Sequence, residues 1–89
     1  MSGLSRSVTA LVALLGGDVD VAGLDARGLR EVLQREVYAA LGAHARLERT
    51  ETDADVRLRA LRQARAIDSA WALVRFEIEV ELGERRRVA

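Results

Sequence analysis

The chain lacks several residues on which small proteins commonly depend. No cysteine occurs among its 89 residues, so disulfide bonds and thiolate metal sites are excluded. Proline is also absent, which removes the strongest helix breaker and favours long uninterrupted helices. With one histidine and no cysteine, the chain has few groups for nucleophilic or acid–base chemistry. We therefore expect a protein that is not an enzyme and that needs no metal or other cofactor.

A net charge and a long hydrophobic run are absent as well. Fourteen basic and fourteen acidic residues cancel at pH 7, so no global field attracts nucleic acid or an anionic membrane. No stretch approaches the roughly 20 apolar residues that a membrane span requires. The short apolar run at 8–15 has no convincing signal-peptide cleavage site after it. Every basic residue is Arg, which is typical of a GC-rich genome, and we expect a cytoplasmic prokaryotic protein without a membrane contact.

The most regular pattern is an apolar stripe in the last third of the chain. Its members recur every three or four residues and lie within roughly 80° on a helical wheel, with no charged residue among them. The pattern predicts one long helix whose apolar side must be covered by something else. The stripe consists of Val56, Ala60, Ala64, Ile67, Trp71, Val74, Ile78 and Leu82.

Two further helices are predicted upstream of this one. Each has its own apolar stripe at helical spacing. Because only a short polar connection separates the two long helices, they should form an antiparallel hairpin. The sequence thus predicts a single all-α domain over 1–89, made of a short N-terminal helix and a long helical hairpin. The expected elements are helices at about 4–15, 26–49 and 53–83, a loop at 16–25 and a basic tail at 84–89.

The expected helix ends have recognisable signals. Gly16 and Gly17 should end the first helix, because glycine adopts the left-handed C-terminal conformation without steric cost. Asp25 is a good N-cap for the second helix. Thr52, with Asp55 three residues later, resembles a capping box at the start of the third.

One stretch permits two interpretations. Residues 74–82 alternate strictly between apolar and charged side chains, which is typical of a half-buried strand. The apolar members Val74, Ile78 and Leu82 also continue the helical stripe in phase. No turn residue separates Trp71 from Phe76, so we favour a helix, with a C-terminal strand as the alternative.

A second, wider apolar stripe on the third helix indicates a protein contact. One antiparallel neighbour cannot cover both apolar sides of a helix. Trp71 belongs to the first stripe, where it is either a core residue or an interface anchor, since Trp is enriched in binding hot spots. We therefore expect an oligomer or a docked protein partner. The interface residues predicted from this reasoning are Leu58, Leu61, Trp71, Phe76 and Val80.

Arginines on the third helix give an alternative function. Arg57, Arg59, Arg62 and Arg65 form either a solvated helix face or a set of phosphate contacts. In architecture, the predicted hairpin at about 25–82 resembles the oligomerisation cores of phage small terminase subunits. The resemblance implies an oligomeric adaptor that handles nucleic acid, although no sequence motif carries it and no helix-turn-helix is recognisable.

Two remaining patterns favour structural roles. Asp18, Asp20 and Gly23 begin like an EF-hand loop, but Ala22 and Leu29 stand where that loop needs oxygen ligands. His44 lies in the apolar stripe of the second helix, which favours a packed interface residue over a ligand or base. The function expected from the sequence is a non-catalytic helical interaction or assembly subunit that self-associates or docks on a protein partner.

Overall fold

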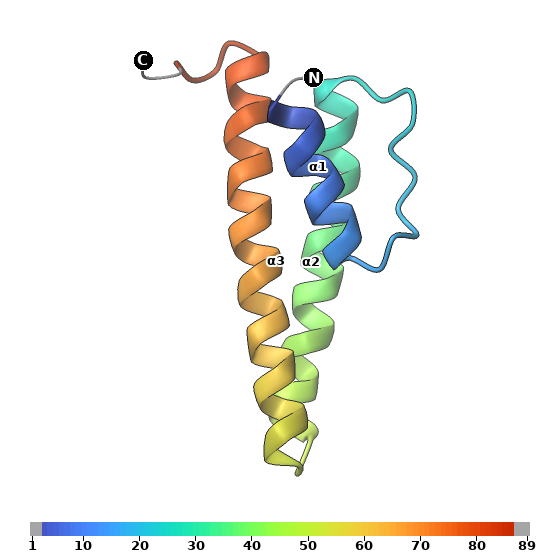
Figure 1. The fold of residues 1–89 in the computed structure, drawn as a ribbon, viewed down its shortest axis with the longest axis vertical. Coiled ribbons are helices and arrows are strands. Elements are labelled where there is room, and N and C mark those ends of the chain that lie inside the picture. Colours follow the sequence, from blue (N-terminus) through green and yellow to red (C-terminus); the bar gives the residue numbers. More distant parts are fainter. Residues whose placement is uncertain (1–2, 87–89) are drawn as a thin grey trace.

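Helices make up all the regular structure in the computed structural model, which describes residues 3–86. The elements are α1 (Gly3–Leu14), α2 (Ala26–Thr50) and α3 (Ala54–Glu81) (Figure 1). The predicted all-α fold is therefore confirmed. The strand alternative for 74–82 is wrong, because α3 stays helical to Glu81.

The phase of the apolar stripe explains why 74–82 is helical. Val74 and Ile78 are both fully buried, and they continue the line of Ile67 and Trp71 on the same side of α3. A strand would have turned Phe76 and Val80 inward together with them. In the helix, these two side chains are only half-buried, because they lie away from the buried side of α3.

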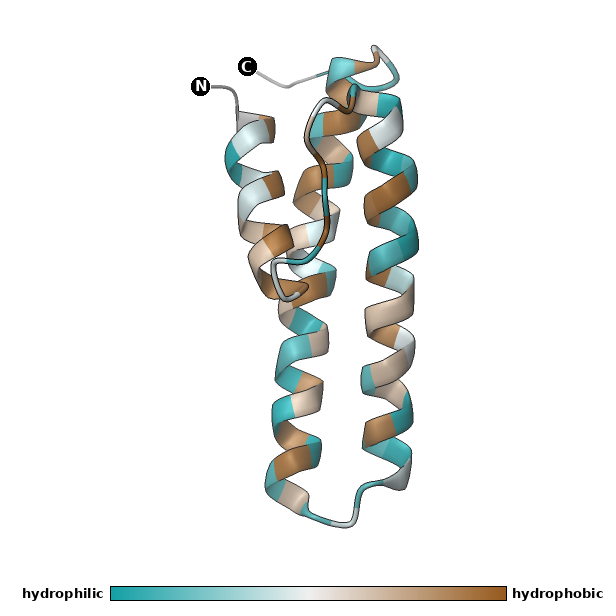
Figure 2. Ribbon diagram, turned by 90° about the vertical axis from the view of Figure 1, so that its right-hand side faces the viewer, coloured by the Kyte–Doolittle hydropathy of each residue, from teal (hydrophilic) through white to brown (hydrophobic). Residues whose placement is uncertain are grey.

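The two long helices pack along each other. In Figure 1, α2 descends, the chain turns at 51–53, and α3 returns beside α2. Arg30 in the first turns of α2 contacts Glu84 just beyond α3, at 2.8 Å from Nη1 to Oε1. The shorter helix α1 packs against α3 and lies along the upper half of the pair in both views (Figures 1 and 2). Within residues 3–86, no third helix lies beside the lower half of the pair.

One hydrophobic core joins the three helices. α1 contributes Val8 and Leu11, and α2 contributes Leu33 and Val37. The largest share comes from the first apolar stripe of α3, as predicted. Its buried members are Ala60, Ile67, Trp71, Val74 and Ile78.

The backbone conformation and side-chain hydrogen bonds at the helix ends define where each helix begins and ends. Gly16 and Gly17 after α1 have φ angles of 101° and 79°, the left-handed conformation predicted for them. Asp25 is confirmed as the N-cap of α2, since its Oδ1 accepts a hydrogen bond from the Gly28 amide at 2.8 Å. The N-cap of α3 is Asp53 and not Thr52, so that prediction is wrong.

A carboxylate explains the displaced cap. Asp53 Oδ1 accepts hydrogen bonds from the amides of Asp55 at 2.9 Å and Val56 at 3.4 Å. The negative charge also lies at the positive end of the helix dipole, an interaction that a threonine hydroxyl cannot make. Glu51 accepts a hydrogen bond from the Asp53 amide at 3.0 Å, which orders the turn before the cap.

Truncation of Trp71 should strongly destabilise the fold. Its side chain is 3% exposed, and Trp→Ala changes in a core cost about 3–5 kcal/mol. Tyr38→Ala is the matched control, because Tyr38 is an aromatic residue with 56% exposure and should change the free energy of unfolding by about 0.5 kcal/mol or less. Urea unfolding followed by far-UV circular dichroism, at equal protein concentrations, gives both values. Equal costs for the two variants would contradict the core position of Trp71.

The ion pair between the ends of α2 and α3 should make stability depend on pH. The hydrogen bond from Arg30 lowers the pKa of Glu84, and its charge acts in the same direction. A lowered folded-state pKa adds stability above the unfolded-state pKa, and this stability is lost as pH falls through the folded-state value. Glu84→Gln should therefore lower the melting temperature slightly at neutral pH and leave it unchanged in strong acid.

Glu81→Gln is the control for this measurement. It removes the same charge from an exposed residue of the last turn of α3. If both variants show the same pH dependence of the melting temperature, the effect is one of net charge and not of the contact with Arg30.

Candidate protein-binding surfaces

One side of α3 presents large apolar side chains to solvent. Leu58 is 43% exposed and Leu73 is 53% exposed, although both belong to a helix whose other side forms the core. On a helical wheel they lie roughly opposite the buried stripe, as Phe76 and Val80 do, with Leu61 at the edge of the same side. We call this set the outer α3 surface, and it consists of Leu58, Leu61, Leu73, Phe76 and Val80.

The predicted interface residues do not all belong to this surface. Leu61, Phe76 and Val80 are half-buried and Leu58 is exposed, so each retains accessible area. Trp71 does not, because it is 3% exposed within the core of its own chain. Its placement among the interface residues needs correction, since α3 turns the indole toward the other two helices. The indole N–H has no hydrogen-bond partner among the described residues.

Leu73 is the surface residue that the sequence reasoning missed. It was not among the predicted interface residues, although it precedes Phe76 by three residues and Val80 by seven and so lies on the same side of α3. The residue type was the signal that could have identified it. A leucine on the side of a helix away from the core is not needed to stabilise its own chain. Its 53% exposure makes it the most accessible leucine of the outer α3 surface.

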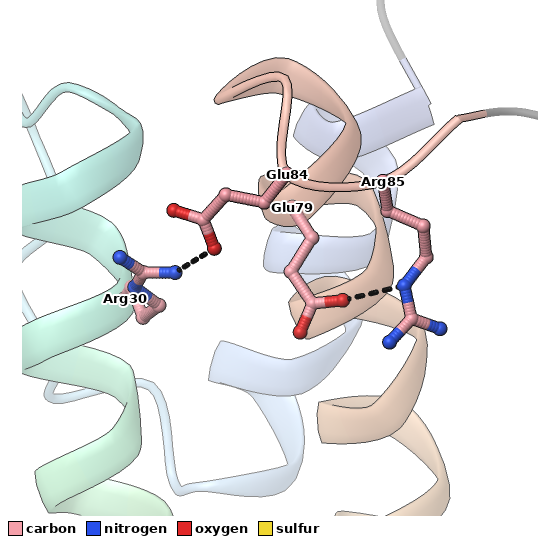
Figure 3. A network of polar contacts seen from close by, with 4 residues as sticks. All are labelled: Arg30, Glu79, Glu84 and Arg85. Carbon is pink, nitrogen blue, oxygen red and sulfur yellow. Dashed lines mark hydrogen bonds and ion pairs between the residues drawn. The ribbon is translucent and has the colours of Figure 1, made fainter.

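Phe76 lies beneath a cation at the C-terminal end of this surface. The guanidinium carbon of Arg85 is 5.5 Å from the centre of its ring, which is within the range of a cation–π contact. Figure 3 shows the ion pair that holds this arginine, with its Nε donating to Glu79 Oε2 at 2.8 Å. The Phe76 ring therefore already accommodates a guanidinium group.

A groove lies between the lower halves of α2 and α3. Its volume is about 510 Å³. Gln63 lines the groove, and its Nε2 donates a hydrogen bond to the carbonyl of Leu14, the last residue of α1, at 3.0 Å. The groove therefore begins where α1 ends. Figure 2 shows the uncovered half of the helix pair. His44 is half-buried in this groove, so the histidine faces α3 across an open space. The groove residues are His44, Leu47, Val56, Arg59, Ala60, Arg62 and Gln63.

The four candidate phosphate-binding arginines do not converge. All four are exposed. Arg59 and Arg62 line the groove, whereas Arg57 lines a separate hollow with Glu48. Arg65 lines neither. The helix thus spreads the positive charges over several directions.

The acidic loop has local structural roles. Asp20 Oδ1 accepts a hydrogen bond from the Ala22 amide at 3.1 Å, and Asp25 caps α2. Over residues 3–86, no group of three or more His, Asp or Glu side chains is arranged to hold a metal ion. Within the same range, no helix has the length and apolar character needed to cross a membrane.

Comparisons of the chain with protein-family models, with curated proteins and with solved structures find no match. The outer α3 surface and the groove are therefore the features of the chain that point to a function.

Proposed function

We propose that this chain is a non-catalytic assembly subunit that self-associates through the outer α3 surface. The observation that carries the proposal is the exposure of Leu58 and Leu73, 43% and 53%, on the side of α3 that faces away from the core. Removing apolar surface from water contributes about 25 cal/mol per Å². Pairing these side chains with another apolar surface would therefore stabilise an assembly.

A second copy of the chain is the partner that this surface fits best. A symmetric contact places the same patch on both subunits, so one apolar surface covers the other. The patch lies on a helix that is anchored by its own buried side, including Ile67 and Val74. Such a rigid surface needs little ordering when it binds, which lowers the entropic cost of association.

The proposal contains no catalytic step. His44, the one histidine, shares its groove with Leu47, Val56 and Ala60. The residues that line this groove include no Ser, Thr, Asp or Glu, so the histidine has no nucleophile or carboxylate beside it there.

A nucleic-acid-handling adaptor, similar to the phage small terminase subunits, is the alternative. Four exposed arginines of α3 favour it. It has less support than self-association because Arg59 and Arg62 line the groove whereas Arg57 lines another hollow. Binding of labelled DNA or RNA that weakens steeply with salt would support this alternative, since counterion release produces that dependence.

A single lysine on the outer α3 surface should disrupt the assembly. We expect light scattering over a concentration series to give a mass above that of one chain for the wild type. Leu73→Lys should raise the dissociation constant about tenfold or more, which corresponds to about 1.4 kcal/mol, because a charge would be buried at the contact. Far-UV circular dichroism should show unchanged helicity, since Leu73 is 53% exposed.

Tyr38→Lys is the matched control for this variant. Tyr38 is a large side chain with 56% exposure on α2, outside the outer α3 surface, and its replacement should leave the mass unchanged. Phe76→Lys should weaken the assembly in the same way as Leu73→Lys. A wild-type chain that stays monomeric at all concentrations would refute self-association, and loss of the assembly in Tyr38→Lys alone would place the contact on α2.

A further inference from the structure

The charges of α3 are divided between its two ends. Residues 57–65 contain four Arg and no acidic residue, whereas residues 77–84 contain four Glu and no basic residue. The first segment lies in the lower part of α3, and the second reaches its C-terminal end and the turn beyond it. Residues 57–65 are therefore positive and residues 77–84 negative, while Asp53 and Asp55 precede the first segment and Arg85 and Arg30 pair with Glu79 and Glu84 of the second.

Two apolar residues near the ends of the outer α3 surface lie at equal distances from one central residue. Ser69 is exposed and lies roughly opposite the buried stripe on a helical wheel. Leu58 and Val80 lie 11 residues before and after Ser69. Arg62 and Phe76 lie 7 residues before and after it. A small side chain thus lies at the middle of the surface, with apolar groups toward both ends.

We propose that a second copy of the chain docks on α3 in antiparallel orientation, about a twofold axis beside Ser69. This inference rests on the self-association proposed above and specifies its geometry. The segment 57–65 of each copy then lies along the segment 77–84 of the other, so opposite charges meet twice. A parallel arrangement would place the four arginines of both copies side by side, which is destabilising.

The antiparallel register also brings one pair of apolar groups together, Leu58 and Val80 of the partner subunit. It places Arg62, which lines the groove in the single chain, at the level of Phe76 of the partner subunit. Phe76 already has the Arg85 guanidinium 5.5 Å from its ring centre, so a second guanidinium at the interface would meet a ring that is suited to one. Arg59 and Glu77 fall on the same side of α3, and in this register they lie close across the interface.

A charge-reversal series tests the orientation. Arg59→Glu/Arg62→Glu removes the net positive charge of residues 57–65, and Glu77→Arg/Glu81→Arg removes the net negative charge of residues 77–84. We expect each double variant to raise the dissociation constant of the homodimer about tenfold or more. The fourfold variant, which combines all of these changes, exchanges the charges of positions 59 and 77 and so restores an opposite pair across the interface. It should return the dissociation constant to within about threefold of the wild type.

Mixing wild-type and variant chains also tests the orientation of the two copies. The fourfold variant should not pair with an affinity-tagged wild-type chain, because an antiparallel contact would then place like charges together. In a parallel dimer the two chains would attract each other and co-purify. Arg35→Glu/Arg46→Glu is the control, since it reverses two exposed arginines of α2 and should leave the dimer unchanged.

Single cysteines report the register directly, because the chain contains none of its own. Ser69→Cys should form a disulfide-linked dimer rapidly, since both copies of residue 69 lie beside the axis. Leu58→Cys alone should not, because residues 58 and 80 are about 33 Å apart along a helix and a disulfide needs Cα atoms within about 7 Å. A mixture of Leu58→Cys and Val80→Cys chains should yield the mixed disulfide.

The outcomes separate this inference from the function on which it rests. If Leu73→Lys dissociates the assembly but the fourfold variant stays monomeric, self-association stands and the antiparallel geometry is wrong. Rapid self-linking of Leu58→Cys would likewise overturn the geometry. A monomeric wild type, or one that binds only labelled nucleic acid, would overturn both.

Discussion

The structure depends on one constraint, the burial of a continuous apolar side of α3. Ile67, Trp71, Val74 and Ile78 are at most 3% exposed, and they meet residues of both other helices in a single core. A chain of this size buries only about 60–65% of the surface that its unfolded form exposes. It has no cysteine, and no metal-binding group occurs within residues 3–86. The fit of α1 and α2 on that one side is therefore the main source of stability for the described part of the chain.

The unequal lengths of the helices determine which surfaces remain open. α1 has 12 residues, whereas α3 has 28, so α1 can follow only part of the helix pair. The amide of Gln63 binds the last carbonyl of α1, and the groove opens from that point. The outer α3 surface has a different origin, because it lies on the side of α3 that faces away from α1 and α2. The outer α3 surface is better suited to an assembly contact than the groove is, because Leu58 and Leu73 are already exposed to solvent.

The features that depend on local sequence patterns were predicted correctly. The predictions were wrong or incomplete where a feature depends on the path of a turn or on the packing of other helices. The helical phase of Val74 and Ile78 with Trp71 was sufficient to favour a helix over a strand, and Asp25 identified the start of α2. The cap of α3 was misplaced because Thr52 and Asp53 are adjacent acceptors, and only the path of the turn selects between them. The spacing within α3 placed Trp71 on the apolar side that must be covered, but it did not tell whether α1 and α2 of the same chain or a partner would cover it.

The division of charge along α3 carries information that the fold does not require. The core needs only that the buried side be free of charge, and exchanging Arg59 with Glu77 would leave that side unchanged, because both lie away from it. The helix dipole does not require this order either, because it acts mainly on the first and last turns, where Asp53 and Asp55 already provide the favourable negative charge. In the proposed antiparallel dimer, each charged segment would lie beside its opposite, and the two helix dipoles would also oppose each other. A division of charge that one copy does not need would then contribute to the contact between two, which is the physical reason to seek the partner of α3 in a second copy of the chain.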